Sequence, residues 1–202
     1  MLAFFIIFGA VVLDQFTKFL VRLYMNVGES FTLIPGIMNI TYVENDGAAF
    51  GMLDNARWVF LIISCVAITG IVWFLRKHGS RHPLLTVSLS FIAGGGIGNM
   101  IDRIFVTDAN GTNVVTDFFE TKFVKFAVFN IADSFITVGA ILLGFYIIFI
   151  EPKVEKRLKS AAAAANAAAA NAAAEADTDD AEADEYDRKD NGENENNCTE
   201  NR

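Results

Sequence analysis

Acidic and amide side chains recur at helical spacing beside long apolar stretches of this chain. Asn99 and Asp102 are three residues apart, as are Asn130 and Asp133, so each pair shares one helix face. Asp117 stands in a strand-like apolar run shortly before the second pair. Two neighbouring carboxylates can share a proton, so that one accepts a proton while the other donates one. Asp117 and Asp133 are therefore candidates for a general acid–base pair.

Four apolar segments would hold these residues in place. They cover about residues 2–24, 57–75, 83–104 and 129–150, and each is close to the roughly 20 residues that cross a bilayer. The first segment could instead be a cleaved signal peptide, but it carries Asp14 and Lys18 and has no clear cleavage site. We expect an all-α polytopic membrane protein with four transmembrane helices.

The basic residues predict how these helices cross the membrane, because Lys and Arg are enriched in short cytoplasmic loops. A basic loop at 76–82 joins the second and third segments, and a second basic cluster at 153–159 follows the fourth. Both chain termini are then cytoplasmic. The two remaining loops, at about 25–56 and 105–128, face outward.

The polar residues of three segments then lie at one depth. Asp14 falls in the outer half of the first segment, Asp102 ends the third segment, and Asp133 begins the fourth. Carboxylates are rare and costly inside a bilayer and mark functional sites there. Their common depth therefore predicts one site near the outer face.

The segments outside the helices differ in character. Residues 31–34 and 37–43 are rich in β-forming residues and flank a Pro-Gly turn, which predicts a small extracytoplasmic β-sheet. Residues 152–202 form a predicted cytoplasmic tail that is basic, then Ala-rich and finally acidic. Residues 175–202 hold too few large apolar side chains to bury a core and are predicted to be disordered. The membrane domain would be residues 1–151.

Composition excludes several classes of function. Of the 202 residues 53% are hydrophobic, and the mean hydropathy is +0.37. The net charge of −8 comes mostly from the end of the tail, and we expect no nucleic-acid partner. Cys65 and Cys198 form no disulfide framework, and His78 and His82 have no ligand-like partners. No metal site is therefore expected.

Two further patterns each have two interpretations. Asp14 and Lys18 are four residues apart, and they form either an ion pair that lowers the cost of burying both charges or a direct substrate contact. We expect a supporting role for both. The glycine-rich run at 94–98 either lets helices approach closely or leaves a thin helix face that admits a bulky lipid or peptide. The two interpretations of the glycines are compatible.

The polar residues lie within five blocks that resemble, in order and spacing, those of the lipoprotein signal peptidases (signal peptidase II). The resemblance covers about residues 1–151. One block alone would mean little, but five blocks on four apolar segments are specific. The blocks are Asp14–Lys18, Asn45–Phe50, Gly95–Arg103, Val115–Phe118 and Phe129–Ser134.

The resemblance implies an aspartic endopeptidase of the bacterial plasma membrane. Such an enzyme removes signal peptides from diacylglyceryl-modified prolipoproteins at the outer face, cutting just before the lipidated cysteine. It uses no metal or organic cofactor, and we expect a monomer in contact with membrane lipid. By this resemblance Asp117 and Asp133 are catalytic. The substrate-binding residues would be Asn45, Gly47, Asn99, Arg103 and Asn130, and the supporting residues Asp14, Lys18 and Asp102.

The chain departs from the family pattern at residues 104–116, which form a longer connector. This connector contains Asp108, a rival for the catalytic acid. We prefer Asp117 because an aromatic residue follows it.

The alternative function is a small transporter or channel, but that class requires polar residues through the full depth of the bilayer. A presenilin-type protease would need Tyr-Asp and Gly-x-Gly-Asp within its helices, and neither occurs in the four segments.

Overall fold

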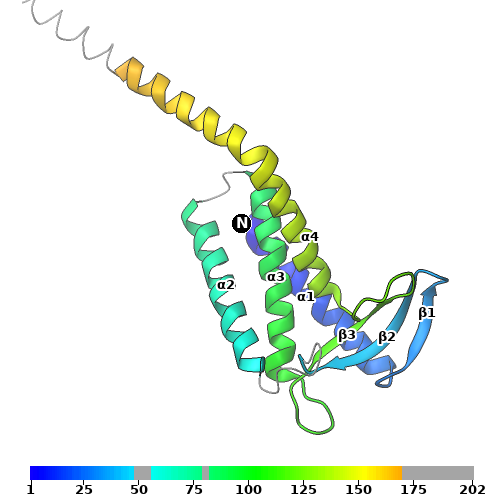
Figure 1. Ribbon diagram of the computed structural model, residues 1–202. Coiled ribbons are helices and arrows are strands. Elements are labelled where there is room, and N and C mark those ends of the chain that lie inside the picture. Colours follow the sequence, from blue (N-terminus) through cyan, green and yellow to red (C-terminus); the bar gives the residue numbers. More distant parts are fainter. Residues whose placement is uncertain (48–55, 79–81, 170–202) are drawn as a thin grey trace, which may run out of the picture. The chain divides into compact units, whose positions relative to one another are not determined.

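The computed structural model describes residues 1–47, 56–78 and 82–169 of the chain. The chain divides into two compact units, Met1–Ile148 and Phe149–Arg202. In the second unit, residues 151–169 are helical. The first unit holds the helices and strands labelled in Figure 1. Its helices are α1 (Leu2–Tyr24), α2 (Ala56–His78), α3 (Pro83–Phe105) and α4 (Ile131–Phe145), and α4 is followed by the π-helical turn η1 (Tyr146–Ile150).

The prediction of four transmembrane segments is confirmed. Among the described residues, four helices are long and apolar enough to cross a membrane, and they are Leu2–Tyr24, Trp58–Lys77, Pro83–Phe105 and Ile131–Ala169. The fourth begins two residues later than predicted because Asn130 caps it, accepting a hydrogen bond from Asp133 N. It also continues past the predicted end at 150, since the Ala-rich stretch is helical up to residue 169. The stretch 175–202, predicted to be disordered, lies outside the described residues.

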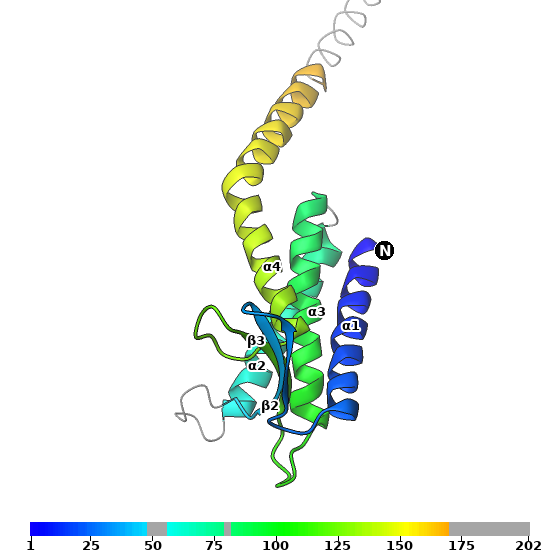
Figure 2. The ribbon, with the colours of Figure 1, turned by 90° about the vertical axis from the view of Figure 1, so that its right-hand side faces the viewer.

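Helix α3 is the centre of the bundle and contacts α1, α2 and α4 (Figure 2). Its glycines allow the close approach. A Cβ atom added at Gly94 would lie 2.7 Å from Cβ of Ala10 on α1, and one at Gly95 would collide with the carbonyl oxygen of Ala132 on α4. The space beside these two glycines is thus filled by neighbouring helices, as the packing interpretation predicts.

The predicted sheet is present and contains three antiparallel strands in the order β1-β2-β3. The strands are β1 (Ser30–Ile34), β2 (Met38–Asn45) and β3 (Val115–Thr121). Strands β1 and β2 form a hairpin whose turn contains Gly36 at a φ of +73°, a conformation that favours glycine. The third strand comes from the second outer loop and pairs with β2, placing Asp117 opposite Val43.

The sheet packs on the last turns of α1 through a buried apolar cluster. Val21 of α1, Tyr42 of β2 and Phe118 of β3 form this cluster. Side chains alternate between the two faces of a strand, so Asp117 points to the opposite face from Phe118. The packing of one strand residue against α1 therefore fixes the direction of the neighbouring carboxylate.

The connector between α3 and β3 closes on itself as a small hairpin. Thr107 and Asn113 form an isolated bridge across it. At its tip the Asp108 carboxylate accepts hydrogen bonds from the backbone N–H groups of Asn110 (2.9 Å) and Thr112 (2.7 Å). Asp108 thus stabilises its own turn, as Asp side chains commonly do.

Candidate active site

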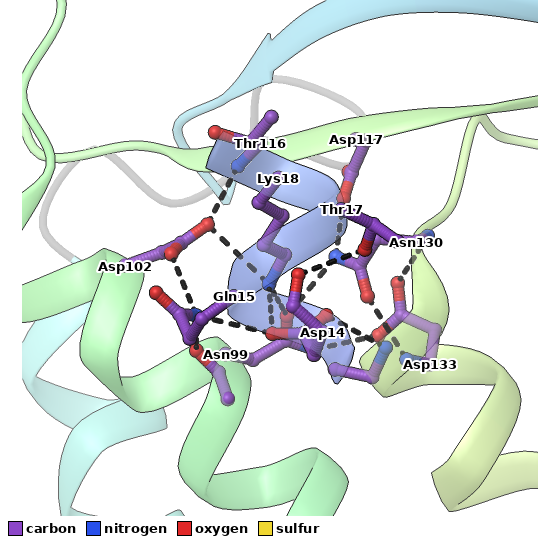
Figure 3. A network of polar contacts seen from close by, with 12 residues as sticks. Asp14, Gln15, Thr17, Lys18, Asn99, Asp102, Thr116, Asp117, Asn130 and Asp133 are labelled. Atoms are coloured by element: carbon purple, nitrogen blue, oxygen red, sulfur yellow. Dashed lines mark hydrogen bonds and ion pairs between the residues drawn. The ribbon is translucent and has the colours of Figure 1, made fainter. Parts of the chain in front are cut away.

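A cluster of buried charges lies where α1 passes α3 (Figure 3). Lys18 Nζ is 2.9 Å from Asp14 Oδ2 and 3.3 Å from Asp102 Oδ2, and none of the three side chains is exposed. Arg22 adds a second cation, 3.6 Å from Asp102 Oδ1. The ion pair predicted for Asp14 and Lys18 is present. Two cations balance two carboxylates, which buried charges require.

The two carboxylates of this cluster also hold the backbone on either side of the bundle. Asp14 Oδ1 accepts a hydrogen bond from Ala132 N at 2.9 Å, and Asp102 Oδ2 accepts one from Thr116 N at 3.0 Å. The two donors directly precede Asp133 and Asp117. The buried ion cluster therefore positions both candidate catalytic residues through the backbone N–H of the residue before each.

Asn130 connects the two candidate catalytic carboxylates (Figure 3). Its side-chain Nδ2 donates to Asp117 Oδ1 at 2.7 Å, and its backbone N donates to Asp133 Oδ2 at 3.2 Å. Two more amides complete the set, since Asn99 Nδ2 donates to Asp133 Oδ1 at 2.7 Å and Asn45 Nδ2 to Asp117 Oδ2 at 2.8 Å. Each of the four carboxylate oxygens therefore accepts one hydrogen bond.

The three asparagines are each fixed in one orientation by a donor on their carbonyl side. Asn45 Oδ1 accepts from Gly47 N at 2.9 Å, and Asn130 Oδ1 accepts from Asp133 N at 3.0 Å. Asn99 Oδ1 accepts from Lys18 Nζ, also at 2.9 Å. With the carbonyl group occupied, the NH₂ group of each amide must face a carboxylate. Substrate contact by Asn99 and Asn130 stays a prediction; here their amides bind the acids.

The environment of Asp117 favours its protonated form. The residue is 3% exposed, and burial raises its pKa to about 6; the nearby charge of Asp133 adds to this rise, while the hydrogen bonds from Asn45 and Asn130 oppose it. Asp117 and Asp133 open into a cavity of about 520 Å³. Its other walls are Asn45, residues 126–129, Ser134, Thr137 and Val138. Two carboxylates thus meet a mainly apolar space with room for a ligand.

Some residues of the site were not predicted from the sequence. Phe60 of α2 lies under the Arg103 guanidinium, whose Cζ atom is 5.2 Å from the ring centroid. A Cβ atom added at Gly47 would lie 3.7 Å from the same ring. Gln15 donates through Nε2 to Gly98 O at 3.0 Å. Only Arg22 carried a usable signal, since it follows Lys18 by one helical turn.

A family model of signal peptidase (SPase) II matches residues 6–149. This chain belongs to the signal peptidase II family. Among its relatives, the lipoprotein signal peptidase of Symbiobacterium thermophilum is 45% identical, over 71% of this chain and 92% of the relative. That of Brevibacillus brevis is 42% identical, over 66% of this chain and 85% of the relative.

Solved structures of bacterial membrane enzymes share the fold of this signal peptidase II. One matches with a TM-score of 0.66 at 33% identity, covering 73% of this chain and 93% of the other. A second has a TM-score of 0.64 at 34% identity, covering 72% and 87%. The family resemblance read from the five sequence blocks is confirmed. Residues 48–50 of the second block lie outside the described residues.

Proposed function

We propose that this chain is an aspartic endopeptidase that cuts diacylglyceryl-modified prolipoproteins just before the lipidated cysteine. Membership of the signal peptidase II family supports the broader function, which is removal of signal peptides from prolipoproteins by a membrane enzyme. The observation that carries the finer proposal is the Asn130 bridge. One residue donates to Asp117 and to Asp133, and both carboxylates face one cavity.

The proposed reaction is hydrolysis of a peptide bond by one water molecule. The ionised carboxylate takes a proton from the water molecule while the oxygen of that water bonds to the carbonyl carbon of the peptide. The protonated carboxyl group polarises the carbonyl and then gives its proton to the leaving nitrogen as the C–N bond breaks. The two acids exchange roles in protonation and titrate as a coupled pair. No metal or organic cofactor takes part in this scheme.

In this proposal the substrate reaches the cavity from the lipid bilayer. The cavity is bounded by apolar residues 126–129 and by Val138 of α4, and the latter side chain is 45% exposed. The exposed apolar face of α4 continues from there with Ile141, which is 66% exposed. A diacylglyceryl group would lie against this face with its thioether-linked cysteine at the carboxylates. The basic clusters at 76–82 and 153–159 support cytoplasmic termini and an outer-facing site in a monomer.

The test uses the purified full chain in lipid nanodiscs with a diacylglyceryl-modified substrate peptide. Asp117→Asn and Asp133→Asn should each abolish cleavage while the circular dichroism spectrum stays helical. Asp108→Asn is the matched control, because asparagine still accepts the two backbone hydrogen bonds of that turn. Substantial turnover by Asp117→Asn or Asp133→Asn, the two variants of the catalytic dyad, would refute the aspartic mechanism. Loss of activity in Asp108→Asn would instead indicate that the catalytic acid lies in the connector.

The lipid requirement is tested separately with one peptide sequence in two forms. The diacylglyceryl-modified form should be cut on the amino side of the modified cysteine, as mass spectrometry of the products would show. The unmodified form should resist cleavage. Equal cleavage of both forms, or a cut elsewhere, would overturn the proposed specificity and leave a general membrane endopeptidase.

A further inference from the structure

Lys18 makes one contact that its role in the ion cluster does not require. Its ammonium group has three N–H donors, and two of them face Asp14 and Asp102. The third faces Asn99 Oδ1 at 2.9 Å. Figure 3 shows Lys18 reaching from α1 to this point between the ion cluster and the acids. The side chain is not exposed, so it cannot contact a substrate directly.

This contact determines which way the Asn99 amide faces. Asn99 Oδ1 accepts from Lys18 Nζ and also from Asn130 Nδ2 at 3.0 Å. A flipped amide would set its NH₂ group against the ammonium and its carbonyl oxygen against Asp133. Both of those contacts are repulsive. Lys18 therefore holds Asn99 so that Nδ2 donates to Asp133 Oδ1 at 2.7 Å.

Asp117 and Asp133 lie in different surroundings. Both oxygens of each acid accept a hydrogen bond, but Asp133 also lies in the first turn of α4, where the helix dipole stabilises negative charge. Asp117 is on a strand and 3% exposed, whereas Asp133 is half-buried beside the cavity. Asp117 is thus the more buried of the two acids, whereas Asp133 is the one at a helix N-terminus.

We propose that Lys18 is a positioning residue that acts through Asn99 to keep Asp133 as the ionised member of the dyad, the group that takes the proton from water. Asp117 then carries the shared proton. The raised pKa of Asp117, about 6, agrees with this division of roles. The inference rests on the proposed function, since it assigns roles within that dyad.

Other charged groups also act on Asp133, and the test must leave them in place. Asp117 on β3 and Arg103 on α3 both interact with it electrostatically. Lys18 on α1 acts on the dyad both through its charge and through Asn99. A substitution that removes the charge but keeps a donor separates these two effects.

The experiment compares Lys18→Met with Lys18→Gln, which have similar lengths and both lack the charge. Only glutamine can still donate to Asn99. The experiment measures kcat/KM as a function of pH for cleavage of the diacylglyceryl-modified peptide in nanodiscs. The readout is the acid limb of this profile, where kcat/KM rises with pH. Lys18→Met should move this limb to higher pH by about one unit, a tenfold loss on the limb. Lys18→Gln should move the limb less, by the effect of the lost charge alone, with KM unchanged in both.

The experiment also includes a control variant and, where it is needed, a second substitution that restores the charge balance of the ion cluster. Lys122→Gln removes a cation that pairs with Glu120 at the protein surface, away from Asn99, so it should leave the limb unmoved. If the single Lys18 variants fail to fold, both are repeated with Asp14→Asn, which restores charge balance. Identical limbs in the Met and Gln variants would overturn the inference and make Lys18 purely structural. Turnover by Asp117→Asn or Asp133→Asn would instead refute the dyad itself.

Discussion

The backbone N–H of Thr116 donates to Asp102 Oδ2 at 3.0 Å, so a buried carboxylate on α3 fixes the strand residue next to Asp117. Asp14 on α1 does the same for α4 through Ala132. The ion cluster around Lys18 is therefore part of how the site is assembled. Substitutions can separate the contribution of this cluster to the stability of the fold from its proposed contribution to catalysis.

Asp102→Ala should destabilise the protein strongly. The change leaves Lys18 with one carboxylate fewer and the buried Thr116 N–H without an acceptor. Removing one partner of a buried ion pair costs about 3–5 kcal/mol. Thermal unfolding in detergent should show a large fall in melting temperature together with loss of cleavage. Asp108→Ala in the connector turn should cost far less, and equal losses in the two variants would contradict the role of the cluster.

Gly98→Ala should disrupt the contact between α1 and α3. A Cβ atom at Gly98 would collide with the Asp14 carboxylate, which holds Ala132 N. Overpacking of this kind costs about 1–3 kcal/mol, and here it also displaces the residue before Asp133. Both unfolding temperature and kcat should fall.

Gly144→Ala is the matched control for this substitution. It lies on α4 with no atom within 4 Å of an added Cβ, and alanine favours helix over glycine by up to about 1 kcal/mol. The control should therefore be neutral or slightly stabilising. An equally damaging effect at both positions would show that helix flexibility, rather than the contact with Asp14, is affected.

Asn45→Ala should change the pH dependence of cleavage. The hydrogen bond from Asn45 favours ionised Asp117, and burial has already raised the pKa of that residue from 3.8 to about 6. Without the bond, Asp117 keeps its proton to higher pH, so the descending limb of kcat/KM should move in the alkaline direction. Because the folded-state pKa lies above the ordinary value, ionisation of Asp117 lowers stability as pH rises from about 4 through 6.

The control for this prediction is Asn39→Ala, on the same strand. Asn39 Nδ2 donates to Ser30 Oγ and to Glu120 Oε2, away from the acids. Its pH profile should match that of the unsubstituted protein. A descending limb that stays in place in Asn45→Ala would show that Asp117 does not control it.

Much of the fold could be predicted because hydrophobic length alone identifies membrane helices. The start of α4 could not, since it depends on the cap formed by the Asn130 side chain. The sheet was predicted only in part. The pairing of Asn45 with Val115 joins strands that are 70 positions apart, and no local pattern encodes such a register.

The candidate site was predicted by residue type but not by the direction in which each group faces. Substrate contact by Asn99 and Asn130 stays a prediction, but the hydrogen bonds from their amides to the carboxylates were not predicted. Amide orientation depends on the donor opposite each carbonyl, and Lys18 supplies that donor from another helix. Hydrogen-bond partners between helices leave no periodic signal in one sequence.

Phe60→Leu tests the aromatic contact that the sequence did not reveal. The Arg103 guanidinium lies over the Phe60 ring, and a cation over an aromatic face is stabilised by about 0.5–2 kcal/mol. Leucine keeps the apolar contact with the space beside Gly47 but loses the ring face. If Arg103 binds substrate, KM should rise severalfold while kcat changes little, because the dyad keeps all its hydrogen bonds. Val66→Leu, at a 68% exposed position on the same helix, should leave both constants unchanged, and a fall in kcat for Phe60→Leu would place Arg103 with the acids instead.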